Sequence, residues 1–146
     1  MALDLSYKGK KFPSYTFKVE HCKIKELCGA IGDQNPIYFD SEEAKKEGYK
    51  DSPAPLTFAT LMSFWGYPEI WGKMTEIGID IKRLLHAKEE YEYLDLIYPG
   101  DTLEGTVSVD ALRDGKMQMA AFKTEFKRDG LVVLVAKMTI MVPPSN

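Results

Sequence analysis

A short polar segment at residues 31–38 carries side chains whose types and spacing suit acid–base chemistry. Asp33 offers a carboxylate, Asn35 offers an amide that can orient it, and Pro36 fixes the backbone that follows. A polar group on a rigid corner suits proton transfer, because the geometry must hold before the pKa matters. The same residue types also favour ordinary turns, because Asp and Asn hydrogen-bond to nearby backbone. Spacing alone leaves an active-site corner and a structural turn both open.

Two helices are predicted on either side of this corner. A helix that ends at Gly32 is indicated by apolar residues at i, i+3, i+4 and i+7, namely Ile24, Leu27, Cys28 and Ile31. Asp40 followed by Glu43 predicts the start of a second helix over residues 41–47, and Gly48 predicts its end. This second helix is polar and is expected at the surface.

Residues 56–65 form the most apolar helix-length segment of the chain. Because apolar side chains occur nearly all round it, the helix is expected to be buried on most sides. Pro55 suits the first helical turn, where its missing N–H costs nothing. The next backbone N–H groups have no partner within the helix and lie at the positive end of its dipole.

The second half of the chain is predicted to be strands joined by turns. Leu85, Ala87, Glu89, Tyr91 and Tyr93 alternate with His86, Lys88, Glu90 and Glu92, which are expected on the opposite face. Turns at residues 99–101, 114–115 and 129–130 separate strands over 102–111, 116–127 and 131–142. A change of alternation near Ala120 and Ala121 predicts a bulge or bend. A short strand at residues 15–19 precedes the first helix.

These elements predict an α+β fold in which a curved antiparallel sheet wraps around a central apolar helix. A chain of 146 residues is expected to form a single domain over residues 1–146. The free edges of such a sheet favour a dimer, of identical chains or of two different ones.

Composition excludes several classes of function. The net charge of −3 gives no basic excess for nucleic acid, and no apolar run is long enough to span a membrane. The N-terminus has no signal-peptide pattern, and Cys22 and Cys28 are interpreted as reduced thiols, so a cytoplasmic location is expected. The sequence offers no metal-ligand cluster, no phosphate-binding loop and no nucleophile elbow.

Six segments in the same order resemble the MaoC-like dehydratases of the hot-dog fold, especially the group related to their N-terminal dehydratase domain. The resemblance covers nearly the whole chain and lies at residues 16–20, 30–38 (AIGDQNPIY), 42–44 with 48–49, 54–58 (APLTF), 84–86 and 98–103 (YPGDTL). It implies an (R)-specific enoyl-thioester hydratase or 3-hydroxyacyl-thioester dehydratase. The substrate would be carried by coenzyme A or by an acyl carrier protein, and no cofactor is implied.

The resemblance also implies roles for individual residues. Asp33 matches the family's catalytic Asp, and Asn35 matches the Asn beside it. The N–H groups of Leu56 and Thr57 match the donors that hold the thioester oxygen, with Pro55 and Phe58 beside them in the substrate-binding segment.

Tyr38 departs from the family pattern, because active relatives carry a catalytic His at this place in Asp-x-Asn-Pro-x-His. A phenol titrates near pKa ~10 and is a poor base at neutral pH, whereas an imidazole near ~6.5 is well matched. The absence of the imidazole is expected to lower the reaction rate roughly 10²- to 10⁴-fold. Two hypotheses follow: a hydratase in which Asp33 acts with Tyr38, and a non-catalytic acyl-binding subunit whose partner supplies the complete pair. A thioesterase-like protein fits the motif less well.

The remaining candidates have ordinary structural explanations. The predicted alternation puts His86 on the polar face of its strand, and His21 is expected at the surface. Aromatic residues near the apolar helix can shape an acyl tunnel or simply fill the core. Lys8, Lys10, Lys11 and Arg83 can meet the phosphates of coenzyme A or of a carrier protein's arm, although solvated charge is the default.

Overall fold

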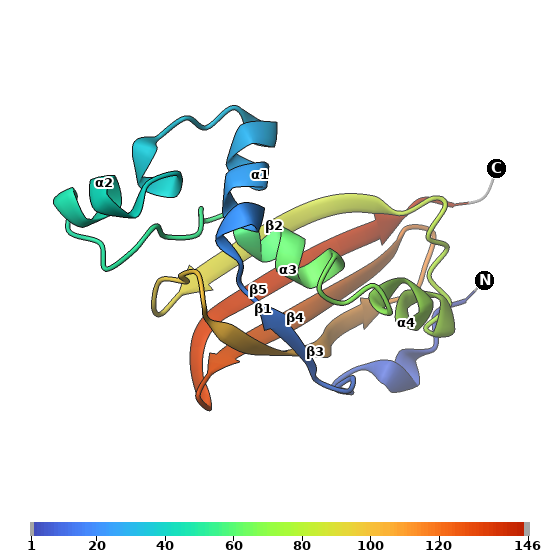
Figure 1. Cartoon of the computed structure of the whole chain (residues 1–146). Helices are drawn as coiled ribbons and strands as arrows, with labels where there is room; N and C mark the ends of the chain where they lie inside the picture. Colours follow the sequence, from blue (N-terminus) through green and yellow to red (C-terminus); the bar gives the residue numbers. More distant parts are fainter. Residues whose placement is uncertain (1, 145–146) are drawn as a thin grey trace.

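A five-stranded antiparallel sheet with helices on one side makes up this computed structural model, which describes residues 2–144 (Figure 1). The strands are β1 (Tyr15–Lys18), β2 (Leu85–Tyr93), β3 (Thr102–Arg113), β4 (Gln118–Arg128) and β5 (Leu131–Val142). Their spatial order is β1-β3-β4-β5-β2, so β1 and β2 form the two edges. The predicted antiparallel sheet around a helix, the hot-dog arrangement, is confirmed.

The helices follow the predicted order with one addition. They are α1 (His21–Ile31), α2 (Ser41–Lys46), α3 (Phe58–Phe64) and α4 (Ile70–Glu76), with short 3₁₀ turns η1 (Leu5–Tyr7) and η2 (Pro36–Tyr38). Residues 66–78, which contain α4, were not predicted to be helical. Its buried Ile70 and Met74 lie four residues apart and face the core, so a helical stripe was present between the breakers Pro68 and Gly78.

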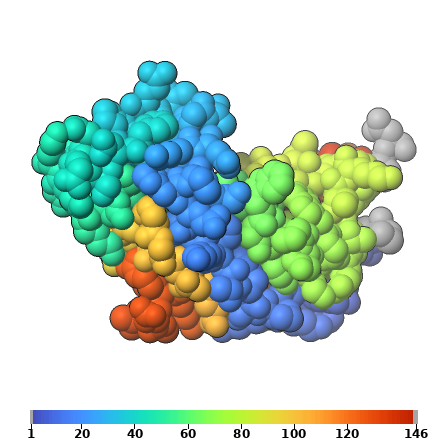
Figure 2. Space-filling view, in the orientation of Figure 1, coloured from blue at the N-terminus to red at the C-terminus, as the bar shows by residue number. Residues whose placement is uncertain are grey.

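The helix α3 crosses the concave face of the sheet, and its predicted burial on most sides is met only in part. Phe58, Ala59 and Met62 are buried, and the other four residues of the helix are half-buried. Trp65, which follows the helix, is 82% exposed, and Leu56, which precedes it, is 59% exposed. Figure 2 shows the segment around α3 and α4, in green, forming part of the outer surface. The sheet covers one side of α3, and this chain covers the other side only in part.

Two apolar clusters form the core between the helices and the sheet. One surrounds α3 and α1 and contains Phe17, Ile24, Phe58, Met62 and Phe126. The other lies under α4 and contains Met74, Val109, Phe122 and Ile140. Tyr15 borders both, and its ring stacks on Tyr67 and meets Phe126 edge-on.

Two strand irregularities differ from the predicted pattern. On β4 the buried residues alternate regularly through Ala120, Phe122 and Phe126, so the irregularity predicted near Ala120 and Ala121 does not lie on β4 itself. The register shift falls on the neighbouring β3, between Val109 and Ala111. A second shift, between His86 and Lys88 on β2, was not predicted and reverses the face on which His86 lies.

Candidate active site

The corner at residues 31–38 begins where α1 ends. Gly32 adopts a left-handed φ of 74°, and its N–H donates to the carbonyls of Cys28 and Gly29. The N–H of Asp33 also donates to the Cys28 carbonyl, at 2.9 Å. In Figure 1, α1 rises from the end of β1, and its far end, followed by Asp33, stands clear of the sheet. The helix ends as predicted, and the corner is set by its left-handed cap.

Asp33 and Asn35 both act on the backbone of their own turn. Asp33 Oδ1 accepts a hydrogen bond from the Asn35 N–H at 3.0 Å, and Asn35 Oδ1 accepts one from the Ile37 N–H at 3.2 Å. The second bond caps η2, whose first residue is Pro36. Both side chains therefore make the hydrogen bonds that an ordinary structural turn requires. The Asp33 Oδ2 atom accepts no hydrogen bond within residues 2–144, so one oxygen of this half-buried carboxylate remains free for other work.

Tyr38 lies close enough to Asp33 for the two side chains to influence each other. Burial raises the pKa of the Tyr38 phenol, and the charges of Asp33, Cys28 and Tyr49 raise it further. The ring is half-buried and packs against the core cluster that contains Phe58. The phenol is therefore protonated at neutral pH and can donate a hydrogen bond, but it cannot act as a general base there.

His21 approaches this corner from the opposite end of α1. Its Nε2 atom lies 3.1 Å from the backbone carbonyl oxygen of Tyr38, and the side chain is half-buried rather than plainly at the surface as expected. Asp33, however, follows the other end of the helix. Eleven helical residues span roughly 16 Å at about 1.5 Å per residue, so this imidazole is not a substitute partner for Asp33.

The segment before α3 presents the two N–H groups that sequence analysis assigns to the thioester oxygen. The helix begins only at Phe58, whose N–H donates to the Pro55 carbonyl at 2.8 Å. Pro55 therefore opens a separate turn and not the first turn of α3. Within the described part of the chain, the N–H groups of Leu56 and Thr57 have no hydrogen-bond acceptor. They remain available to a ligand.

The four predicted substrate-binding residues divide into two kinds. Leu56 and Thr57 are exposed, whereas Pro55 and Phe58 are buried. Phe58 meets Phe17 edge-on at 6.0 Å between ring centroids, which makes its side chain part of the core. The Leu56 carbonyl accepts a hydrogen bond from the Tyr93 hydroxyl at 2.7 Å. Burial raises the pKa of Tyr93, so that hydroxyl stays a donor.

The corner and the pre-α3 turn are joined by no polar contact, although Tyr38 and Phe58 belong to the same apolar cluster. Across residues 2–144, no hydrogen bond, ion pair or ring contact links residues 31–38 with residues 55–58. A hollow does border the corner, lined by Asn35, Pro36, Ile37, Glu43, Glu47 and Tyr49. The single chain thus places the charge of Asp33 where it acts on the Tyr38 phenol but leaves the N–H pair on a separate element.

His86 is exposed as expected, but its predicted place on the polar face of β2 is wrong. Because of the register shift after it, His86 pairs with the buried Ile140 and lies on the same side of the sheet as α3. Its Nε2 atom lies 2.7 Å from a Glu89 carboxylate oxygen, and its ring meets Phe64 edge-on. A bulge of this kind leaves no mark in the alternation of residue types, so sequence reasoning missed the pair.

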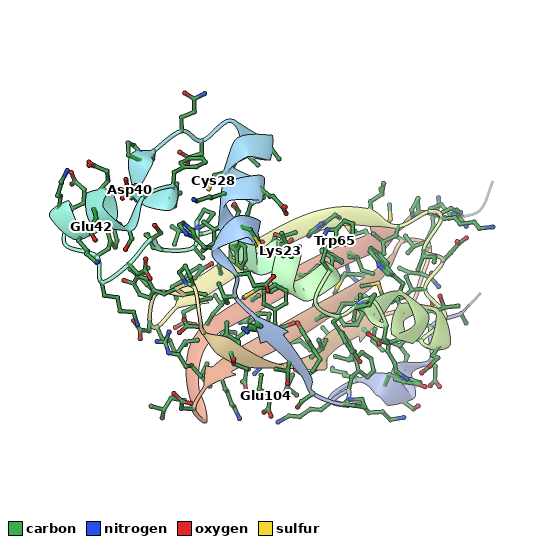
Figure 3. All side chains as sticks on the ribbon, viewed as in Figure 1. Lys23, Cys28, Asp40, Glu42, Trp65 and Glu104 are labelled. Carbon is green, nitrogen blue, oxygen red and sulfur yellow. The ribbon has the colours of Figure 1, made fainter. Side chains whose placement is uncertain are left out.

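An apolar groove lies beside His86 at the end of α3. It is lined by Phe64, Trp65, Trp71, Met74, Leu84, His86, Met138 and Ile140. Figure 3 labels Trp65 at the end of α3 on the outer side. Phe64 and Trp71 stack at 5.1 Å between ring centroids, whereas Trp65 is 82% exposed. Exposed apolar side chains beside the unpaired edge of β2 are typical of an association surface.

Trp65→Ser is expected to leave the free energy of unfolding of the isolated chain within about 0.5 kcal/mol, because the side chain has few contacts to lose. The same change is expected to weaken association of the chain, measured by sedimentation, because it removes an apolar side chain from the exposed groove. Trp71→Ser is the matched control and should destabilise the chain, since that ring stacks on Phe64. A large loss of stability in Trp65→Ser would contradict this assignment.

No group of three metal-ligating side chains occurs among the described residues, and no helix there is long and apolar enough to cross a membrane. Cys28 is buried, which raises the pKa of its thiol, and Cys22 is exposed. Arg83 donates to the Pro143 carbonyl and lies 3.9 Å from Asp80, while Lys10 lies over the Tyr7 ring. The phosphate-binding role of these cations stays a prediction.

Comparison with known proteins identifies a family and confirms the fold. A family model described as "FAS1-like, dehydratase domain region" matches residues 6–136. A UPF0336 protein of Saccharopolyspora erythraea is 36% identical over 114 residues, covering 77% of this chain and 72% of that protein. A UPF0336 protein of Streptomyces avermitilis is 33% identical over 114 residues, covering 77% and 75%.

Solved structures similar to this chain share its fold at low sequence identity. The HadBC (3R-hydroxyacyl-ACP dehydratase) complex of Mycobacterium tuberculosis superposes with a TM-score of 0.78 and 20% identity, covering 92% of this chain and 96% of that one. The ChsH1-ChsH2 complex of the same organism gives 0.74 and 16%, covering 93% and 86%. An (R)-hydratase of A. caviae gives 0.67 and 14%, covering 93% and 96%.

Proposed function

The chain belongs to the family of FAS1-like dehydratase regions, and on that premise we propose that it binds enoyl and (R)-3-hydroxyacyl thioesters as one subunit of a hydratase–dehydratase. A second hot-dog chain supplies the catalytic imidazole. The single observation that carries the proposal is Tyr38: it occupies the place of the family's His, and its raised pKa keeps the phenol protonated at neutral pH.

The reaction needs a base for water and an oxyanion site for the substrate. In hydration, the water oxygen bonds to C3, one water proton is removed by the base, and a proton is delivered to C2. Negative charge develops on the thioester oxygen between these events, and backbone N–H donors stabilise it. In this chain the free N–H groups of Leu56 and Thr57 are proposed to serve the oxygen, and a thioester of coenzyme A or of an acyl carrier protein fits equally.

The open side of α3 supports a role for a second chain. The exposed Leu56 and Trp65 flank α3, and β2 forms an unpaired edge of the sheet. Two of the structures that share this fold are two-chain complexes, HadBC and ChsH1-ChsH2. A partner that covers this face would complete the site with its own acid–base pair.

A self-sufficient hydratase is the second candidate, and one observation favours it. Asp33 keeps one carboxylate oxygen free and lies near Tyr38, so Asp33 can act as the base while Tyr38 donates a hydrogen bond. Without an imidazole such an enzyme is expected to be slower by about 10²- to 10⁴-fold than a complete pair.

The two candidates are separated by assaying enoyl-CoA hydration, from crotonyl-CoA to longer substrates. The purified chain is measured alone and mixed with a hot-dog partner that carries Asp-x-Asn-Pro-x-His. The proposal predicts that the mixture exceeds the chain alone by at least about 10²-fold. It also predicts that Asp33→Asn in this chain leaves the activity of the mixture within about twofold, since the partner performs the proton transfer.

Asp40→Asn is the matched control, because Asp40 caps α2 by accepting from the Glu42 N–H, much as Asp33 caps its own turn. Full activity of the chain alone, abolished by Asp33→Asn but not by Asp40→Asn, would overturn the subunit proposal and establish the self-sufficient hydratase.

A further inference from the structure

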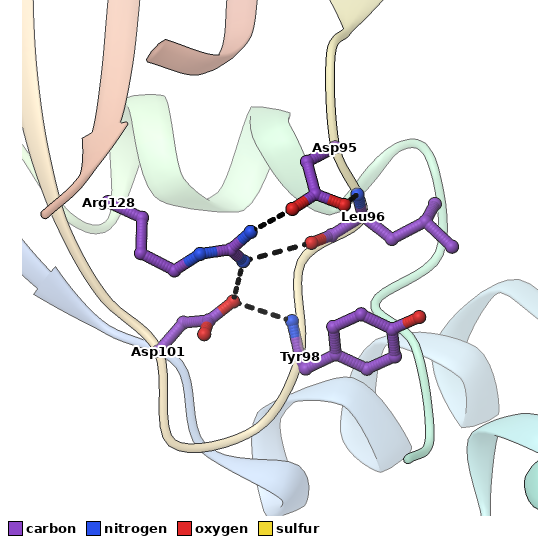
Figure 4. Close-up of polar contacts among 5 residues, drawn as sticks. All are labelled: Asp95, Leu96, Tyr98, Asp101 and Arg128. Atoms are coloured by element: carbon purple, nitrogen blue, oxygen red, sulfur yellow. Dashed lines mark hydrogen bonds and ion pairs between the residues drawn. The ribbon is translucent and has the colours of Figure 1, made fainter. Parts of the chain in front are cut away.

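Arg128, the last residue of β4, holds together a loop that the proposed mechanism does not mention. Its guanidinium donates to three groups of one segment: the Asp95 carboxylate, the Leu96 carbonyl at 3.0 Å and Asp101 Oδ2 at 2.7 Å (Figure 4). The Arg128 and Asp101 side chains are only 18% and 12% exposed. Partly buried, charge-assisted hydrogen bonds of this kind fix geometry as well as adding energy.

The loop between β2 and β3 also contains internal hydrogen bonds beside the guanidinium. Asp101 Oδ2 accepts a second hydrogen bond, from the Tyr98 N–H at 2.9 Å, and Asp95 Oδ1 accepts one from the Leu96 N–H at 2.8 Å. Both carboxylates therefore order backbone of the loop in addition to pairing with Arg128. Removing Arg128 leaves two carboxylates without a counter-charge and frees the Leu96 carbonyl.

One side of this loop fixes the turn that precedes α3. The Ile97 carbonyl accepts a hydrogen bond from the Ala54 N–H at 2.8 Å, and Ile97 and Ala54 are both buried. The peptide group next to it, at Leu96, is the one that Arg128 holds. Leu56 and Thr57, with their unpaired N–H groups, follow Ala54 by two and three residues.

The other side of the loop fixes the start of α1. The Val19 N–H donates to the Asp101 carbonyl at 2.9 Å, and the Gly100 N–H donates to the Val19 carbonyl at 2.9 Å. Val19 is buried and immediately precedes Glu20, the N-cap of α1, whose far end leads to Asp33. The single loop thus contacts both backbone segments that carry the proposed site.

We propose that Arg128 is a positioning residue that sets the N–H pair of Leu56 and Thr57 against the base of α1 through the loop over residues 95–101. The expected effect on ligand binding rests on the proposed thioester-binding function, but the positioning of the two backbone segments by Arg128 does not depend on it. Arg128 acts through the loop, and a lysine cannot replace it because a compact ammonium lacks the two separate nitrogens with which the guanidinium reaches its three acceptors.

The test measures amide hydrogen exchange in the full chain for wild type, Arg128→Lys and Asp95→Asn, with binding of butyryl-CoA as a second readout. Lys123→Met is the control, because Lys123 lies on the same strand and loses an ion pair with Glu125 that does not involve the loop. In Arg128→Lys, exchange at the Ala54 and Val19 amides is expected to rise about tenfold, while interior amides of β3 and β4 stay within about twofold. The affinity for butyryl-CoA is expected to fall about tenfold, and Asp95→Asn is expected to give the same pattern more weakly.

Equal protection of Ala54 and Val19 in wild type and Arg128→Lys overturns the positioning role. So does a uniform loss over all strands, which would show a general contribution to stability. A wild-type chain that binds no acyl-CoA or acyl-carrier-protein thioester contradicts the proposed function, and the exchange data then still decide whether Arg128 positions the two segments.

Discussion

Tyr38→His is expected to raise the enoyl-CoA hydration rate of the isolated chain by about 10²- to 10⁴-fold, the usual contribution of one general acid–base group. The substitution restores the Asp-x-Asn-Pro-x-His pattern beside a carboxylate that keeps one oxygen free. An imidazole titrates near pKa ~6.5 and can accept a proton from water at neutral pH, which the protonated phenol cannot do. The pH profile of the hydration rate of this variant should therefore show a new ionisation near that value.

Two controls isolate the imidazole in this experiment. Tyr38→Phe removes the hydroxyl without adding a base, and should leave the slow rate of the wild type unchanged or lower it. The double variant Tyr38→His/Asp33→Asn should lose the gain, because the new imidazole needs the carboxylate. A folded Tyr38→His variant that binds acyl-CoA yet shows no gain would mean that the corner does not face the thioester.

Phe58→Ala is expected to lower the free energy of unfolding by about 3–5 kcal/mol, the range for truncating a buried Phe. Phe58 is fully buried at the start of α3, meets Phe17 edge-on, and belongs to the cluster that joins α1, α3 and the sheet. The loss combines transfer of the ring to water with the cavity that remains. Urea denaturation of the chain measures it directly.

Phe64→Ala is the comparison variant, since Phe64 lies on the same helix but is only half-buried and stacks on the partly exposed Trp71. Its loss should be clearly smaller. If the two variants lose equal stability, the outer side of α3 is as well packed as the inner one, and the description of an open face is wrong.

Much of the fold was predictable because local signals and burial agree. The stripe from Ile24 to Ile31 with the cap at Gly32 predicted α1, and the turns at Asp114–Gly115 and Asp129–Gly130 predicted the meander. The degree to which α3 is buried could not be predicted. An apolar side chain that packs within the chain and one that stays exposed for a partner are of the same residue types. Trp65 illustrates this ambiguity.

The candidate site was predictable only in part. The turn chemistry of Asp33 and Asn35 follows from residue type, and their hydrogen bonds to the backbone confirm it. The face of His86 depends on a one-residue bulge that no alternation reveals. The role of Arg128 depends on contacts with a loop some thirty residues earlier, and such long-range pairing has no local signal.

The length of α1 affects how precisely Asp33 is positioned. The helix leaves the sheet at Val19 and reaches Asp33 only at its far end, so it behaves as a lever with its pivot at Val19. Over roughly 16 Å, a tilt of about 4° displaces the tip by about 1 Å, and in the Tyr38→His variant a misplacement of that size can cost about 10²-fold in rate. Substitutions that tilt α1 at its pivot should therefore lower the turnover of that variant even where the chain stays folded.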